Sequence, residues 1–481
     1  MVNAASIAAA SARFVRDQLP PGGLFADQHW RIAPAPFPLG AEVAQELESL
    51  GRMLLQFYRA VNLLYRQSVA GKQPPWVAEL LDRGKPSWLI ELQRSPAFRS
   101  DVPRVIRPDV LLTETGLNLI ELDSVPGGIG LTAWLNRTYA LVSSRFQVPG
   151  SKLEQAPPTD NPSAILHPPS SPSELPRTGT VRAPVLGGAE GMIDGFAGIF
   201  GDAPRVHIVV SEEAATYRPE MDWLAKQLEV RGSRFEVRSS TFNDFEAGDA
   251  VYRFFELFDL ANVPSADRIF SLAADKKIRL TPPPKAIFEE KLLFALLWNR
   301  NLRGFWRQEL GEGFFQRLLK LVPYTWAVDP APLPPHAAIP ELNLTDWGQL
   351  KALSQRERDL ILKVSGYSEE AWGARGVYLG SDVSGADWSV AVDKALAAFE
   401  RSPYVLQRYH KPKLVESAYF DFALDKMAPM PGRVRLCPYY FVIGEGDSAR
   451  AQLGGALATI CPADKKIIHG MKDAILAPCT V

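Results

Sequence analysis

The sequence lacks the features that mark secreted, membrane-spanning and nucleic-acid-binding proteins. Its 481 residues include three cysteines, which are too few and too widely spaced for a disulfide framework or a zinc site. No apolar run approaches the roughly 20 residues that a membrane helix needs. The net charge is −1, with 53 basic and 54 acidic residues, so no excess of positive charge favours nucleic acid or an anionic membrane. We therefore expect a cytoplasmic protein that binds neither.

The composition is that of a globular protein with a large core. Hydrophobic residues make up 46% of the chain and charged residues 22%. The length predicts about two to four domains. At the N-terminus, Met1–Ala12 is mildly apolar but lacks the basic start of a signal peptide, so we interpret it as the beginning of a helix.

Local patterns divide the chain into five parts. Apolar residues at three- and four-residue spacing over 41–68 predict an amphipathic helix. A strand at 206–210, a helix at 214–231 and a strand at 235–237 predict a β-α-β unit. The expected parts are a helical N-terminal region (1–100), a carboxylate-bearing hairpin (101–146), a Pro/Ser-rich linker or loop (147–184), a β-α-β layer (185–280) and a C-terminal nucleotide-binding part (281–481). We therefore expect an α+β or α/β chain.

Three carboxylates are expected to converge on the hairpin. Asp109 lies on the first predicted strand, and a turn at 114–116 leads to a second strand that carries Glu121 and Asp123. Alternate side chains of a strand share a face, so Glu121 and Asp123 point the same way and Asp109 returns opposite them. Such a group suits a hard cation, and we predict a Mg²⁺ site. The alternative is an ordinary hairpin with scattered acids.

Two lysines and a glycine-rich loop lie further along the chain. Lys363 ends a predicted strand, and the loop after it contains Gly366, Gly373 and Gly376, whose backbone amides could approach an anion and close over it. Lys291 lies in a helix expected from about Ala286 to Arg300. The alternatives are a glycine-punctuated hairpin for the loop and a solvated lysine at Lys291.

The order of these motifs resembles the circularly permuted ATP-grasp family, whose best known members are the glutathionylspermidine synthetases. The residues that carry the resemblance are Arg107-Pro108-Asp109, Glu121-Leu122-Asp123 with Asp in place of Asn, Lys291 before a Leu-Leu-Trp run, Lys363 with Val364 in place of Pro, and Tyr404–Gln407. Glu121 follows Asp109 by twelve residues, the spacing expected of the family. One departure concerns the late glycine pair, which is followed by Ala456–Thr459 without the expected arginine.

The resemblance implies a permuted ATP-grasp fold, with the β-α-β unit as a pre-ATP-grasp-like layer, and an ATP- and Mg²⁺-dependent carboxylate–amine ligase that forms an acyl phosphate. Its substrates would be small-molecule or peptide acids and amines. In the implied site, Mg²⁺ is held by Asp109, Glu121 and Asp123, the phosphates by Lys291, Lys363, Gly366, Gly373 and Gly376, and the adenine is bordered by Gln407, Arg408 and Tyr409. Arg107 would stabilise the transferring phosphoryl group or instead form a salt bridge to an acid. Arg435 could reach a phosphate or lie at the surface. A phosphotransferase and an inactive nucleotide-binding or scaffold protein are the alternative functions.

Overall fold

The computed structural model describes residues 4–145, 184–232, 234–371, 373, 375–468 and 472–481. The predicted linker at 147–184 lies outside these residues except for Pro184. The described part contains helices and several sheets, which confirms the expectation of a mixed α and β chain. Of its helices, none is long and apolar enough to cross a membrane. The domain boundaries stay a prediction.

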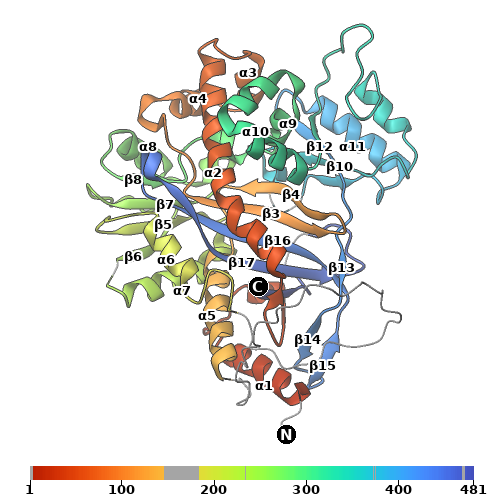
Figure 1. Cartoon of the computed structure of the whole chain (residues 1–481). Coiled ribbons are helices and arrows are strands. Elements are labelled where there is room, and N and C mark those ends of the chain that lie inside the picture. Colours follow the sequence, from red (N-terminus) through yellow and green to blue (C-terminus); the bar gives the residue numbers. More distant parts are fainter. Residues whose placement is uncertain (1–3, 146–183, 233, 372, 374, 469–471) are drawn as a thin grey trace, which may run out of the picture.

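The largest sheet joins strands from both ends of the chain (Figure 1). Its main path runs through β1 (Arg31–Ile32), β18 (Ile475–Thr480), β17 (Arg450–Pro462), β16 (Gly432–Ile443), β3 (Val105–Thr113) and β4 (Gly116–Asp123), and β2 (Phe37–Pro38) and β13 (Leu414–Val415) pair at its side. Strands β3 and β16 pair antiparallel. The predicted hairpin is therefore part of a sheet whose other long strands come from the C-terminal fifty residues.

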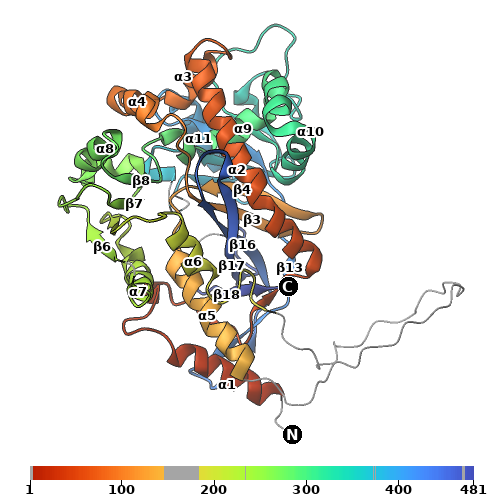
Figure 2. The ribbon, with the colours of Figure 1, turned by 60° about the vertical axis from the view of Figure 1, so that its left-hand side comes forward.

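Alternate residues of these strands face two different cores. On β16, Leu436 and Tyr440 pack into the core under α2 (Ala41–Val69), whereas Cys437 and Tyr439 pack into the opposite core. Helices α5 (Ile129–Arg145) and α6 (Gly191–Gly198) cover that opposite face (Figure 2). The amphipathic helix predicted over 41–68 is thus confirmed as α2, and it is the main cover of one face of the sheet.

Two four-stranded sheets flank the largest one. The first is parallel, in the order β6 (Phe235–Ser239), β5 (Val206–Val210), β7 (Ala250–Phe254) and β8 (Arg279–Thr281), with α7 (Arg218–Glu229) and α8 (Ala266–Ala274) as its helices. The second is antiparallel, in the order β11 (Val377–Leu379), β10 (Leu360–Val364), β12 (Tyr404–Arg408) and β9 (Thr325–Ala327), and α11 (Gly385–Ala397) packs against it. The parallel pairing of β5 with β6 confirms the predicted β-α-β unit.

The helix expected from Ala286 to Arg300 is broken. A 3₁₀ turn covers Ala286–Glu289, and α9 (Leu292–Trp298) starts after Lys291. Tertiary contacts explain the break, because the Glu290 carboxylate pairs with Lys85 and accepts from the Ser365 hydroxyl, which itself accepts from the Leu292 amide. Side-chain partners elsewhere in the fold therefore outweigh local helix propensity.

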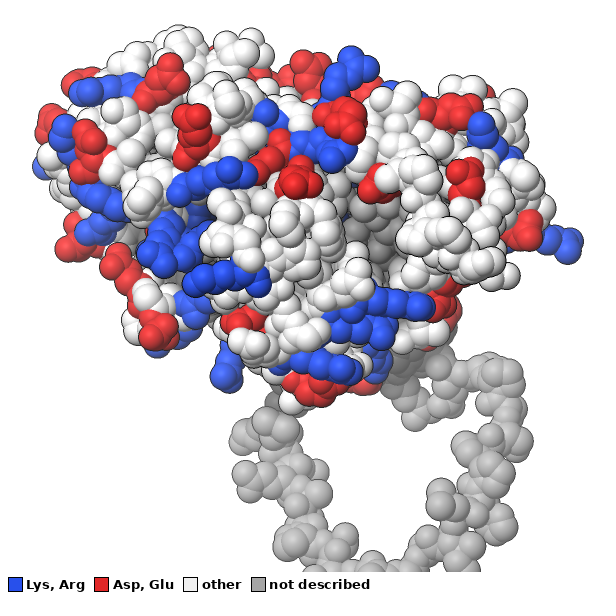
Figure 3. All heavy atoms as spheres, turned by 90° about the horizontal axis from the view of Figure 1, so that it is seen from above, with Lys and Arg blue, Asp and Glu red and all other residues white. Residues whose placement is uncertain are grey.

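The remaining elements complete the outer surface. They are α1 (Ala4–Asp17), α3 (Trp76–Asp82), α4 (Ser87–Arg94), α10 (Arg303–Leu321), β14 (Ala418–Asp421) and β15 (Lys426–Pro429). The face in Figure 3 carries both acidic and basic side chains.

Candidate functional site

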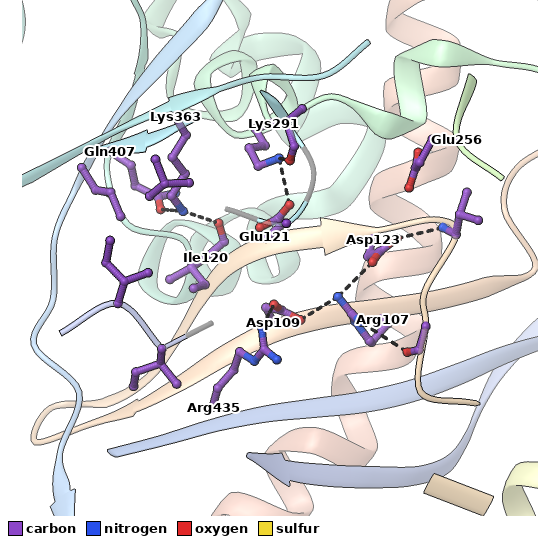
Figure 4. A pocket seen from close by; sticks show the side chains of 18 of the residues that line it. Arg107, Asp109, Ile120, Glu121, Asp123, Glu256, Lys291, Lys363, Gln407 and Arg435 are labelled. Carbon is purple, nitrogen blue, oxygen red and sulfur yellow. Dashed lines mark hydrogen bonds and ion pairs between the residues drawn. The ribbon is translucent and has the colours of Figure 1, made fainter. Parts of the chain in front are cut away.

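A large cavity lies where the three sheets meet. Its walls come from β3 and β4, from β10 and β12, and from the segments after β5 and β7, where parallel strands end. The cavity is partly open to solvent. A concave site lined by a few convergent charged groups is the usual place for a ligand. Nearly all predicted site residues line it or an adjoining smaller cavity (Figure 4).

The carboxylate hairpin has the predicted register. Asp109 lies directly opposite Glu121, and Arg107 lies opposite Asp123. A bulge follows Asp109, so Ile120 is the extra residue on β4. All three carboxylates line the cavity, which places them on one face of the hairpin as the alternation of side chains predicted.

Each of these carboxylates is paired with a buried or partly buried cation. The Arg107 guanidinium lies 3.1 Å from Asp109 Oδ1 and 2.9 Å from Asp123 Oδ2. Lys291 Nζ lies 2.9 Å from Glu121 Oε1. Burial works against charge on Arg107, but Asp109 and Asp123 outweigh it and raise its pKa. Arg107 therefore forms the salt bridge that was its alternative interpretation, and its side chain also lines the cavity.

The three carboxylates are ligands that suit a hard cation, but they are not arranged as a metal site in this structure. In the described part of the chain, no three acidic, thiol or imidazole groups gather closely enough to hold a metal. Burial raises the pKa of Asp123, and Arg107 only partly offsets it. A cation beside Asp123 would favour its ionised form and so lower its pKa. Carboxylates that face one cavity fit Mg²⁺, provided that Glu121 and Asp123 exchange Lys291 and Arg107 for the ion.

The two predicted lysines enter the same cavity from separate elements. Lys291 precedes α9 and its side chain is 11% exposed, which excludes the solvated-lysine interpretation. Lys363 is the next-to-last residue of β10 and donates to Ile120 O at 3.3 Å and to Gln407 Oε1 at 3.0 Å. Burial lowers the pKa of Lys363 to about 8. The pKa of Lys291 is instead raised, because Glu121 outweighs the effect of burial.

The glycine loop contributes unevenly. Gly373 lines the main cavity, and Gly366 lines the smaller one beside it. Gly376 packs away from both, because a Cβ there would lie 2.6 Å from Val364 Cγ2. Trp372 and Ala374 lie outside the described residues. Closure of this loop over phosphates stays a prediction.

The segment from Gln407 to Tyr409 also borders the cavity. Gln407 is buried and bridges Lys363 to the Thr325 hydroxyl, so its side chain holds the lysine in place. Arg408 donates to Glu341 O at 3.4 Å, and the Tyr409 amide donates to Asp359 O at 2.9 Å. Their role beside an adenine stays a prediction.

Two further charged residues line the cavity: Arg435, for which the sequence left a phosphate contact and a surface position open, and Glu256, which the sequence analysis did not single out. Arg435 is buried on β16 and lies 3.0 Å from Asp109 Oδ2, so the surface alternative is wrong. Its strand partner is Thr459, in the segment where the resemblance led us to expect an arginine. Glu256 follows β7, and burial together with Glu289 and Asp123 raises its pKa well above the ordinary value. No local pattern around either residue signals this, because their partners are far away in sequence.

Comparison with known proteins supports the fold. No protein-family model matches the chain, and no curated protein matches its sequence. A solved glutathione synthetase-like effector from Globodera pallida, in its apo form, aligns over 99% of this chain and 96% of its own, with 11% identity and a TM-score of 0.55. A protein of Methylobacillus flagellatus provisionally named gamma-glutamylcysteine synthetase aligns over 93% and 89%, with 11% identity and a TM-score of 0.37, which is too low to support a conclusion. The likeness to the Globodera pallida protein shows a similar fold.

Proposed function

We propose that this chain is an ATP- and Mg²⁺-dependent carboxylate–amine ligase that works through an acyl phosphate on a circularly permuted ATP-grasp fold. One observation carries the proposal: three carboxylates and two lysines, placed by separate elements, line one cavity. The full-length likeness to a glutathione synthetase-like fold supports it.

The reaction has two steps. A carboxylate oxygen of the acid attacks the γ-phosphorus of ATP, the bond to the bridging oxygen breaks, and ADP leaves. The amine then attacks the acyl carbon, phosphate leaves with its oxygen, and the nitrogen loses a proton. Both steps move negative charge, so their catalysis is mainly a matter of positioning and electrostatic stabilisation.

Residues of the cavity have distinct roles in this proposal. Lys291 and Lys363 neutralise the nucleotide phosphates, and Arg107 stabilises the transferring phosphoryl group. Asp109, Glu121 and Asp123 hold Mg²⁺, which supplies neutralising charge for the phosphate oxygens.

Trapping with hydroxylamine tests the proposal. Hydroxylamine attacks acyl phosphates to give hydroxamates, so the protein is incubated with ATP, Mg²⁺, hydroxylamine and panels of small acids and peptides. A ligase gives ADP and a hydroxamate that both require Mg²⁺, and Glu121→Gln loses them. A phosphotransferase gives ADP and a stable phosphorylated acceptor without hydroxamate. Nucleotide binding without ADP formation for any acid would identify an inactive nucleotide-binding protein and overturn the ligase proposal.

A further inference from the structure

Two arginines flank Asp109 on the side of the cavity away from the lysines (Figure 4). Arg107 comes from β3 and Arg435 from β16, and both line the cavity. The Arg107 side chain is 15% exposed and the Arg435 side chain 9%. Lys291 and Lys363 lie on the other side of Asp109, beside Glu121 and Gln407. The cavity therefore has two separate groups of positive charge.

The hydrogen-bonding capacity of the arginine pair is not used up. Arg435 Nη1 donates to Asp109, and Arg107 also donates to Asp123 and, at 3.4 Å, to Gly127 O. The Nε atoms of both arginines are buried and have no hydrogen-bond partner among the described residues. Since both Nε atoms are buried, an anion in the cavity would reach them only if the guanidiniums reorient. Each guanidinium carries five N–H groups, more than the contacts above use, and both side chains line the cavity, which favours a ligand that brings acceptors.

Charge favours the same conclusion. Asp109 is shared by two guanidiniums, and Asp123 is the second acid that pairs with Arg107. A cation held by Asp109 and Asp123 would take over these carboxylates and leave both guanidiniums uncompensated. Guanidinium presents a planar fork that matches carboxylate and phosphate groups, and it stays charged when buried.

We propose that Arg435 and Arg107 form a second anion site, which holds the carboxylate of the acid substrate and then the acyl phosphate made from it. This inference rests on the ligase proposal. Arg435 is the residue that this inference adds to the site. It comes from a strand of the C-terminal part and approaches Asp109 from the side opposite to Arg107. The site selects for a substrate carboxylate near the γ-phosphate, and the amine approaches from the rest of the cavity.

Inorganic phosphate is the probe, titrated into protein saturated with Mg²⁺ and a non-hydrolysable ATP analogue, so that the lysine site is already filled. The line width of the phosphorus resonance of phosphate reports weak binding. Arg435→Met removes the charge, and Arg435→Lys keeps the charge opposite Asp109 but removes the fork. Arg307→Met is the control, because Arg307 is 54% exposed and pairs with Glu312 on the surface of α10. Melting temperatures show that each variant is folded.

We expect phosphate affinity to fall at least about tenfold in both Arg435 variants and to stay unchanged in Arg307→Met. Affinity for the nucleotide analogue should change less than about threefold in Arg435→Lys, while Lys363→Met weakens the nucleotide strongly. Phosphate affinity that is the same in wild type and Arg435→Lys would overturn the inference and leave the ligase proposal standing. Equal weakening of nucleotide and phosphate by Lys363→Met and Arg435→Lys would also overturn it, since one shared site would explain both. Arg435-dependent phosphate binding in a protein that binds no nucleotide would reject the ligase proposal and keep the anion site.

Discussion

Lys363 is the cavity cation whose charge should respond to pH in the range of ordinary assays. Its side chain is buried, and its ammonium donates to two uncharged oxygens, Ile120 O and Gln407 Oε1. Burial lowers its pKa to about 8, and the neighbouring charge of Lys291 also lowers it. Nucleotide phosphates bind the charged ammonium better than the neutral amine. Nucleotide affinity should therefore be highest below pH 8 and fall as the pH rises through 8.

The expected sizes follow from this pKa. With a pKa near 8, about one Lys363 in eleven is protonated at pH 9, so the affinity should fall about tenfold between pH 7 and pH 9. Lys363→Met removes a charge-assisted contact, which should cost about 1.5–3 kcal/mol at pH 7. That cost corresponds to a rise in Kd of about 10- to 150-fold.

Lys291→Met is the matched control. Glu121 raises the pKa of Lys291, so this lysine keeps its charge from pH 7 to pH 9. Calorimetric titration with a non-hydrolysable ATP analogue and Mg²⁺ at pH 7, 8 and 9 separates the two. Lys291→Met should weaken binding at every pH and, because it removes a charge that lowers the pKa of Lys363, move the fall in affinity to higher pH. Lys363→Met should instead remove the fall. A slope that persists in Lys363→Met would refute the assignment of the titration to this lysine.

Three further perturbations test other parts of the structure. Glu220 is buried, accepts from the amides of Gly128 and Leu131, and has a pKa raised to about 7 by burial, so its protonated form favours folding below pH 4.5 and this contribution is lost as the pH rises to 7. The free energy of unfolding in urea should therefore fall by about 3 kcal/mol across this window, and Glu220→Gln should flatten the change. In Gly366→Ala the new Cβ would lie 2.3 Å from Glu289 O, so we expect a loss of about 1–3 kcal/mol in urea unfolding, whereas Gly304→Ala, in open space, should lose nothing. Glu121→Gln should raise the Mg²⁺ concentration for half-maximal nucleotide binding at least about tenfold, and an unchanged Mg²⁺ requirement would remove this residue from the metal site.

The hairpin was predictable because its information is local. Alternation along two adjacent strands and a short turn determine which side chains share a face, and the observed register places Asp109 opposite Glu121 as expected. The lysine at the end of β10 follows from a short apolar run for the same reason. Local patterns, taken together with the family resemblance, therefore named most of the residues that line the candidate site.

Long-range pairing was not predictable in the same way. Arg435 reaches Asp109 because β16 pairs with β3, which lies more than 300 residues earlier in the chain. From the sequence, Gly454 and Gly455 are expected to follow the last clear strand as a glycine pair, yet both lie inside β17. Their function is close packing, since a Cβ on Gly454 would lie 2.4 Å from Phe441 and one on Gly455 would lie 2.7 Å from Asn136. Only the folded arrangement reveals what each glycine makes room for.

The ion pairs of the cavity explain why the charged residues could be identified but their arrangement could not. Buried charges are tolerated only when they are paired, so a chain that keeps Asp109, Glu121 and Asp123 in a cavity must supply cations from elsewhere in the fold. Here those cations are Arg107, Lys291 and Arg435. Such pairs add little net stability compared with apolar packing of the same volume. In the ligase proposal these pairs would exchange partners: the cation of the ligand would replace a lysine or arginine at the carboxylates, and its anion would replace a carboxylate at the released base.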